Sequence, residues 1–337
     1  MTIQAPTMAG GPRLDPSFPS AAPWWRRVRL GQFGTVWVAL ALLVVFAVIF
    51  APSAVTPSAL VAMLPFAAVL MIVAIGETLV IQQQGLDFSV AGMMALTIVI
   101  VTKIPNGNTA VLPTAIAIAV GAAILAGLLS GIAITIFNVP PLVATLGVNA
   151  LLLGAAQAVS GGSITSAAKP FNAFMIGTFL WLPVSLWIAL VILAIAVVIA
   201  RQTKGGRNFE AAGANPRTAR AAGVNTLVVR IVTYCAASVL YCLAAIVYTG
   251  YLETPEIYGG NEYLLSAISA VVIGGTALTG GRGSLIATAV ACVFVQLLNQ
   301  VVFALGAPTS TQYLVSATVI AGAMVVRIWI RGGRSTG

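Results

Sequence analysis

The sequence contains no histidine and few charged residues, and these two shortages exclude several classes of function. Charged residues make up 7% of the 337 residues, whereas soluble domains average about 25%, which argues strongly against a water-soluble fold. Without histidine the chain cannot build a Ser-His-Asp triad, histidine acid–base chemistry or most zinc sites. The three cysteines, Cys235, Cys242 and Cys292, lie inside apolar runs, and we expect them to pack as small apolar side chains.

Hydrophobic residues, by contrast, make up 60% of the chain. One membrane span requires about 20 mostly apolar residues, so this content allows about ten spans. Breaks in the apolar runs place the spans near residues 33–50, 59–81, 88–102, 111–136, 142–159, 181–200, 228–249, 263–279, 285–305 and 311–328. We therefore predict an all-α, polytopic helical bundle of about ten transmembrane helices in a lipid bilayer.

Three regions depart from this pattern of apolar runs. Residues 1–30 are polar and rich in Pro, Gly and Ser, which predicts a disordered cytoplasmic tail. We expect the membrane domain at residues 31–330 and a short cytoplasmic tail at 331–337. The first apolar run has no convincing cleavage site, so we expect an uncleaved first helix. The polar insert Gln82–Gly85 predicts either a tight inner hairpin or a helix broken at membrane depth.

The distribution of basic residues predicts the orientation of the chain in the membrane, independently of hydropathy. With ten spans and the N-terminus inside, fourteen of the sixteen basic residues fall on the inner side, and only Lys103 and Lys169 fall outside. The positive-inside rule therefore predicts that both termini are cytoplasmic. The net charge of +9 does not predict a nucleic-acid partner, because most basic residues lie in short segments between apolar runs.

Residues 201–227, RQTKGGRNFEAAGANPRTARAAGVNTL, form the one long inner connection. We expect a short helix from about Asn208 to Ala222, with Asn208 as its N-cap and Glu210 in its first turn. The pair Asn215-Pro216 predicts a turn or restart, and Gly223 closes the segment. The residues alone leave two interpretations open: an ordinary basic loop, or a helix that docks on another protein.

Three stretches contain ordered motifs: EAAGANPRTARAAGV, GETLVIQQQGLDFSVAGMMAL and AISAVVIGGTALTGGRGSLIATAV. Together they resemble permeases of ATP-binding cassette (ABC) importers, in the branch that carries ribose and other simple sugars. The stretch EAAGANPRTARAAGV resembles their cytoplasmic coupling loop through Glu210, Gly213, Asn215, Pro216, Ala219 and Gly223. The stretch GETLVIQQQGLDFSVAGMMAL resembles a signature of the family, with a glutamine at 84 where a glycine is usual, through Gly76, Thr78, Gly85, Asp87, Ser89 and Val90. The stretch AISAVVIGGTALTGGRGSLIATAV resembles a third segment, at a predicted inner turn, through Gly274, Gly275, Thr276, Gly280, Gly281 and Gly283.

The resemblance implies a permease of the bacterial inner membrane that imports a monosaccharide or related polyol by alternating access. It implies a second permease subunit, a cytoplasmic ABC ATPase and an extracytoplasmic sugar-binding protein as partners. The chain has no G-x-x-x-x-G-K-[ST] loop, so we expect it to bind no cofactor and no metal and to leave ATP and Mg²⁺ to the partner. The residues expected to couple to that ATPase are Glu210, Ala211, Gly213, Asn215, Pro216, Arg217, Arg220 and Gly223.

Few polar side chains are available to line a path for sugar. The candidates are Gln82, Gln83, Gln84, Asp87, Ser89, Asn149, Gln157, Gln296 and Asn299. Each of the amides has an ordinary alternative role in hydrogen bonding between helices, and Asp87 resembles a helix cap. Glu77 falls toward the end of the second expected span, where an unpaired charge would be costly, and we expect glutamine side chains or a neighbouring subunit to satisfy it.

Two further hypotheses follow from the acidic residues. Three acids share one predicted outer loop and could dock the binding protein by contacting its basic residues: Glu253, Glu256 and Glu262. The second hypothesis is an alternative function, an ion-coupled secondary transporter of a small neutral solute. Such a transporter would use carboxylates at membrane depth, and only Glu77 and Asp87 are placed to do so.

Overall fold

A computed structural model describes residues 34–163 and 165–306, together with residues 308, 311, 314, 315, 317, 318 and 322. All of these residues belong to one unit, Gln32–Gly337, and the other unit, Met1–Gly31, lies outside them. The expected tails at 1–30 and 331–337 therefore lie outside the described residues, and the expected span at 311–328 lies almost entirely outside them.

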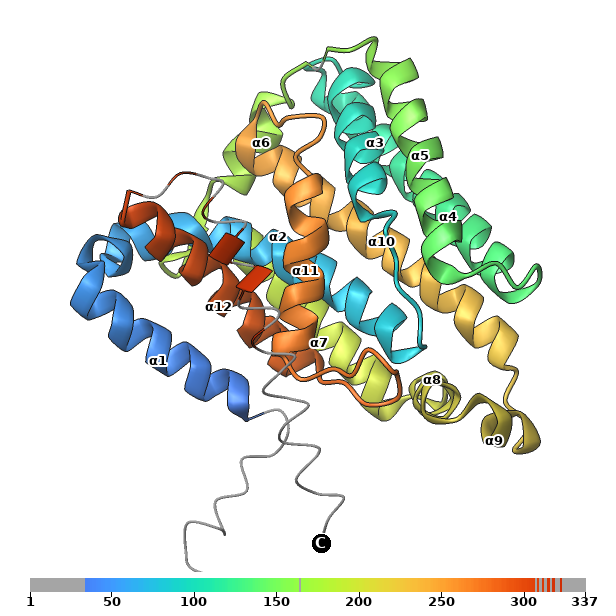
Figure 1. Ribbon diagram of the computed structural model, residues 1–337. Helices are drawn as coiled ribbons and strands as arrows, with labels where there is room; N and C mark the ends of the chain where they lie inside the picture. Colours follow the sequence, from blue (N-terminus) through green and yellow to red (C-terminus); the bar gives the residue numbers. More distant parts are fainter. Residues whose placement is uncertain are drawn as a thin grey trace, which may run out of the picture. The chain divides into compact units, whose positions relative to one another are not determined.

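The described part of the chain is helical (Figure 1). The first six helices, α1 to α6, are Thr35–Phe50, Pro57–Gln82, Val90–Lys103, Leu112–Thr135, Pro141–Ser160 and Lys169–Met175. The next six, α7 to α12, are Val184–Gln202, Lys204–Ala214, Pro216–Ala221, Thr226–Leu252, Asn261–Ile273 and Leu285–Ala304. The short helices η2 (Pro52–Val55) and η3 (Thr109–Val111) and a hairpin of two strands, β1 (Thr178–Phe179) and β2 (Leu182–Pro183), lie in the connections.

Six segments are long and apolar enough to cross a membrane: α2, α5, α7, α10, α12, and α4 together with η3. The apolar helices α1, α3 and α11 are shorter. These nine segments coincide with the nine spans expected before residue 306, so a polytopic, helical membrane protein is confirmed. Two expected boundaries are wrong. The span expected at 263–279 ends at Ile273, because Gly275 has the positive φ of +93° that ends a helix, and the span expected at 181–200 begins after the β hairpin.

Helices α2 and α3 form the centre of this bundle. Every residue from Ala67 to Thr78 in α2 and from Val90 to Thr102 in α3 is buried. Helix α2 packs against α7, α10, α11 and α12, and α3 packs against α4, α5, α10 and α11. Helices α5 and α7, in contrast, expose many large apolar side chains, as expected where a helix faces lipid.

The long helices α4 and α10 meet through glycine. A Cβ atom placed on Gly127 would overlap the backbone of Cys235, and one placed on Gly131 would lie 2.9 Å from the Cα atom of Ile231. The spacing Gly127-x-x-x-Gly131 puts both residues on one face of α4, where small residues let two helix backbones approach closely. The close packing of α4 against α10 therefore requires residues without side chains at positions 127 and 131.

The connection between α2 and α3 begins with a tight turn, as in the first of the two arrangements that the sequence left open. Residues 83–84 make a tight turn at the end of α2, and the chain then runs back without helical structure to α3 (Figure 1). Gln84 has a φ of +63°. A left-handed conformation favours glycine, the residue that the resemblance implies at this position. Residues 83–89 thus form a non-helical segment that is mostly buried, with Gln84 exposed.

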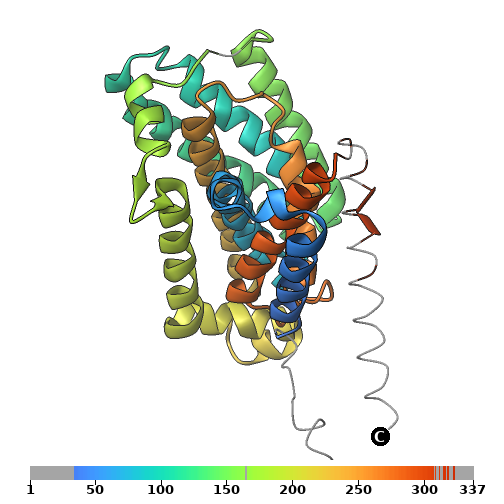
Figure 2. The same ribbon diagram turned by 90° about the vertical axis from the view of Figure 1, so that its left-hand side faces the viewer.

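Connections expected on the same side of the membrane contact one another. On the expected outer side, Lys103 Nζ donates a hydrogen bond to Ser163 Oγ (3.4 Å), and the amide of Ala167 donates to the carbonyl of Glu253 (2.7 Å). On the expected inner side, the amide of Gly281 donates to the carbonyl of Gln82 (2.9 Å). Helices α8 and α9 lie at that inner end, across the end of α7 (Figure 2).

Candidate functional site

Two side chains of α5 bind the end of the non-helical segment 83–89 and the start of α3. Thr145 Oγ1 accepts from the amide of Phe88 (3.1 Å), and Asn149 Oδ1 accepts from the amide of Gly92 in the first turn of α3 (2.7 Å). Thr145 and Asn149 are four residues apart and so lie on one face of α5. Non-helical backbone inside a membrane protein requires such internal partners. Asn149, a path candidate, therefore makes a contact between helices.

Asp87 turns the chain into α3. Its Oδ1 atom accepts hydrogen bonds from the amide (2.9 Å) and the hydroxyl (2.6 Å) of Ser89, and both residues are fully buried. The N-cap of α3 is Ser89, and its side chain makes no capping bond. The expectation that Asp87 caps the helix is therefore wrong in detail: its carboxylate closes a local two-residue turn that precedes the helix.

Glu77 is fully buried in α2, and a tyrosine satisfies part of its hydrogen-bonding capacity. The hydroxyl of Tyr241 donates to Glu77 Oε1 (3.3 Å), whereas Oε2 has no hydrogen-bond partner among the described residues. No described glutamine bonds to this carboxyl, and a neighbouring subunit stays the other expected partner. Tyr234 is a second buried tyrosine of α10. Tyr234 and Tyr241 were not among the sequence candidates. Their signal is a spacing of seven residues, which places both on one face of an apolar helix.

The basic connection 201–227 folds into two helices. Helix α8 begins at Lys204, earlier than expected, because Thr203 is its cap: Thr203 Oγ1 accepts from the amide of Gly206 (3.0 Å). Asn208, the expected cap, lies inside the helix. The expected restart is confirmed, since Asn215 caps α9 by accepting from the amides of Arg217 (3.0 Å) and Thr218 (3.2 Å).

Helices α8 and α9 present one face outward and one face to the bundle. Most of the expected coupling residues are exposed: Glu210, Ala211, Asn215, Arg217, Arg220 and Gly223. Pro216 is half-buried, whereas Gly213 is buried against the end of α2. A Cβ atom on Gly213 would lie 2.5 Å from the carbonyl oxygen of Gln82. Gly213 therefore belongs to the contact between α8 and the membrane helices, opposite the outward face.

Two glutamines of the 83–84 turn hold α8. Gln83 Nε2 donates to the carbonyl of Phe209 (2.7 Å), and Gln84 Nε2 donates to the carbonyl of Gly213 (3.3 Å). The turn between α11 and α12 reaches the same place through the hydrogen bond from Gly281 to Gln82. Three path candidates thus lie together where the end of α2, helix α8 and this glycine-rich turn meet.

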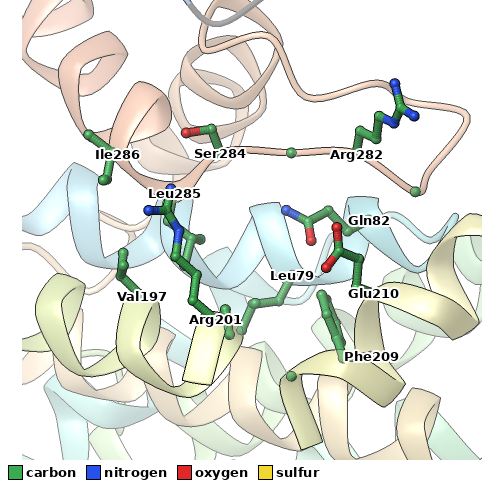
Figure 3. A pocket seen from close by; sticks show the side chains of 14 residues that line it. Leu79, Gln82, Val197, Arg201, Phe209, Glu210, Arg282, Ser284, Leu285 and Ile286 are labelled. Carbon is green, nitrogen blue, oxygen red and sulfur yellow. The ribbon is translucent and has the colours of Figure 1, made fainter. Parts of the chain in front are cut away.

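A cavity of about 360 Å³ borders this junction (Figure 3). Its lining comes from the ends of α2 and α7, from α8, and from the turn before α12 and the start of that helix, and it includes Arg201, Arg282 and Glu210. Glu210 points from α8 toward the end of α2, where Gln82 lies (Figure 3). The cavity therefore lies beneath the half of α8 that contains Gly206, Phe209 and Glu210.

The other candidates lie elsewhere. Gln157, at the far end of α5, accepts from the hydroxyl of Tyr258 (2.9 Å). On α12, Gln296 Nε2 donates to the carbonyl of Phe66 (3.5 Å), and Asn299 is half-buried. Glu256 and Glu262 are exposed and Glu253 is half-buried, all three between α10 and the first turn of α11. Of the path candidates, only Gln82 lines the described cavity.

Comparison with known proteins shows which family this chain belongs to. Residues 59–324 match a family described as "Branched-chain amino acid transport system / permease component". The ribose import permease protein RbsC of Escherichia coli (strain K12) is 33% identical over 295 residues, covering 85% of this chain and 91% of that protein. The galactofuranose transporter permease protein YtfT of the same strain is 33% identical over 263 residues, 77% of each protein.

A third relative is the fructose import permease protein FruF of Bifidobacterium longum (strain NCC 2705). It is 30% identical over 254 residues, covering 73% of this chain and 71% of that protein. No solved structure gives a significant match to the chain.

Proposed function

Because this chain belongs to the family of permease components described for branched-chain amino acid transport systems, we propose that it is the membrane subunit of an ABC importer for a simple sugar. The chain is a multi-pass membrane permease of the bacterial inner membrane and not an enzyme. The proposed cargo is a monosaccharide or a related polyol that moves into the cytoplasm by alternating access.

The observation that carries this proposal is the exposed helix pair α8–α9. It lies at the end of the bundle and is bound to the turn after α2, and six of the eight expected coupling residues are exposed, although Glu210 among them points toward the cavity. The sequence has no phosphate-binding loop of its own. A separate cytoplasmic ATPase that presses on α8 and α9 would reach the membrane core through this contact. ATP and Mg²⁺ would bind to that partner, and this chain would bind no cofactor.

The proposed topology has ten spans, with the tenth at 311–328 and both termini in the cytoplasm. The contacts among connections expected on one side support alternating sidedness through the described helices. The distribution of basic residues supports the inner position of α8 and α9. A second permease subunit, identical or different, would complete the assembly. We place the docking of a sugar-binding protein at the opposite end, near Glu253, Glu256 and Glu262.

A neutral cargo agrees with the polar groups available. The relatives described above are named for ribose, galactofuranose and fructose, whereas the family description names branched-chain amino acids. An amino acid is a zwitterion and needs charged partners inside the membrane, where charges are costly. Apart from Asp87, the path candidates are amides and one hydroxyl. Such groups bind sugar hydroxyls without burying a net charge.

The proposal is tested by purifying the chain with its associated proteins and reconstituting the complex in vesicles. We expect an ABC ATPase and a binding protein to co-purify. In vesicles whose lumen corresponds to the cytoplasm, ATP enclosed in the lumen should drive uptake of labelled D-ribose, D-galactose or D-fructose. Ionophores should leave this uptake unchanged. Uptake by the chain without the ATPase would contradict the proposal.

Glu77 distinguishes the importer from the ion-coupled alternative. We expect Glu77→Gln to transport like the wild type, because the amide oxygen can still accept the hydrogen bond from Tyr241. Glu77→Leu removes that acceptor and leaves a buried hydroxyl unpaired, which costs about 1–3 kcal/mol of folding stability. ATP-driven uptake and thermal unfolding measure the two effects. If a well-folded Glu77→Gln protein loses uptake, an ionisable carboxyl is required and ion coupling is favoured.

A further inference from the structure

We propose that Gln83 is a positioning residue for transport: its side-chain hydrogen bond to Phe209 transfers movement of α8 into segment 83–89. This inference rests on the proposed function, because a partner ATPase must move α8. It goes beyond the coupling role of α8 by naming the contact through which the membrane core receives the movement.

The contact is short, buried and directional. Gln83 is 4% exposed, and its Nε2 atom lies 2.7 Å from the carbonyl oxygen of Phe209. Gln84 adds a second bond of 3.3 Å to the carbonyl of Gly213. Phe209 and Gly213 are four residues apart, so one face of α8 receives both bonds. The side chains of Gln83 and Gln84 thus bind two carbonyls of α8 that are one helical turn apart.

Close backbone contact reinforces these hydrogen bonds. The carbonyl oxygen of Gln82 lies only 2.5 Å from the position that a Cβ atom on Gly213 would occupy. The same carbonyl accepts the amide of Gly281 from the turn before α12 (2.9 Å). Helix α8 therefore cannot slide past the end of α2 without displacing residues 82–84.

Movement at Gln83 would continue into the buried core. Residues 85–89 follow directly and are fixed by Thr145 on α5 and by the turn between Asp87 and Ser89. Helix α3, which is buried from Val90 to Thr102, begins where this segment ends. A non-helical segment between two helices is a place where small changes in backbone angles reorient the helix that follows.

The cavity gives α8 room to move. Gly206, Phe209 and Glu210 border a cavity of about 360 Å³ on one side of the helix. The start of α8 packs on the end of α7, because a Cβ atom at Gly206 would overlap the carbonyl of Ala200, and the two glutamines bind the carbonyls of Phe209 and Gly213. Helix α8 is thus held along its length and would shift toward the cavity as one piece. The Gln83 contact would then pass this shift to segment 83–89.

Hydrogen exchange in the purified complex of permease and ATPase tests this inference without requiring the cargo. Exchange is compared between the nucleotide-free complex and the complex trapped with ATP and vanadate, for peptides that cover α8 and residues 83–90. In the wild type we expect nucleotide to change exchange in both peptides. In Gln83→Glu, which keeps the shape but loses the N–H donor, we expect the change to persist in α8 and to be lost at 83–90.

A second variant and a matched control complete the design. Gln83→Leu should behave like Gln83→Glu, so the result does not depend on the added charge. Gln300→Leu is the control, because Gln300 Nε2 donates to the carbonyl of Ala54 at the same 2.7 Å but far along the chain from α8. This control should keep the nucleotide response at 83–90.

The outcomes separate the two proposals. If nucleotide leaves α8 unchanged in the wild type, the proposed function fails. If α8 responds but residues 83–90 do not respond in the wild type, or respond equally in both Gln83 variants, the role of Gln83 is overturned and the proposed function stands. If the variants no longer retain the ATPase, Gln83 supports folding of the docking helix, and its role in transmission is likewise overturned.

Discussion

Replacing Gly213 by Asp is expected to abolish sugar uptake while the permease still inserts into the membrane. The new Cβ atom would lie 2.5 Å from the carbonyl oxygen of Gln82 and 3.1 Å from Gln83 Nε2. The nearer atom belongs to the backbone of α2, so α8 has to move away, and the hydrogen bond from Gln83 to Phe209 is stretched. The carboxylate would also be buried beside the Gln82 carbonyl oxygen, and the nearest donor, Gln83 Nε2, could satisfy it only by giving up its hydrogen bond to Phe209. Uptake in cells and the amount of permease in the membrane fraction measure the two effects.

Gly205 provides the control for this experiment because it lies on the same helix. The nearest atom to a Cβ at Gly205 is Thr203 Oγ1 at 3.6 Å, which is an ordinary van der Waals contact. Gly205→Ala should therefore transport normally, whereas Gly213→Ala should already reduce uptake. Normal uptake by Gly213→Asp would show that α8 does not act through its contact with α2. Loss of uptake in both alanine variants would indicate instead that α8 tolerates no added side chain.

The sequence predicted the coupling segment well because its main signals are local. The pair Asn215-Pro216 placed the start of the second helix correctly, since the cap and the restricted proline act within three residues. The predicted start of α8 was wrong because both Thr203 and Asn208 can cap a helix. The choice between them depends on where α7 ends and how closely Gly206 packs on the backbone of Ala200, which is a tertiary contact.

The site around segment 83–89 was predicted only in part for the same reason. Asp87 and Ser89 were recognised from a local motif, and their mutual hydrogen bonds are local. Thr145 and Tyr241 were missed because each acts on a residue that is distant in sequence. Threonine and tyrosine within apolar helices are common, so nothing in their own neighbourhoods distinguishes these two.

Hydropathy placed the helices but not their packing. Nine expected spans correspond to helices because burial in lipid or protein requires continuous apolar runs. Hydropathy gives no information on which helix faces which, since lipid-facing and protein-facing surfaces are both apolar. The enclosed position of α2 and α3 and the exposed position of α7 therefore emerge only from the structure.

The second large effect is expected at the crossing of α4 and α10. Gly127→Leu should strongly destabilise the folded permease, because a Cβ atom at this position would overlap the backbone of Cys235 and cannot be relieved by rotating a side chain. Overpacking of this kind costs about 1–3 kcal/mol, and more where backbone must move. We expect a lower Tm in detergent and less protein in the membrane fraction than for the wild type.

Gly121→Leu is the matched control, because it introduces the same side chain on the same helix. A Cβ atom at Gly121 meets nothing within 4 Å, so the leucine should leave the Tm unchanged. A Tm for Gly127→Leu equal to that of Gly121→Leu would mean that α4 and α10 can separate without loss of folding. Since α10 also carries Tyr241, a separation of these helices should displace the partner of Glu77 as well. Gly127→Leu is therefore expected to reduce uptake by more than its loss of folded protein explains.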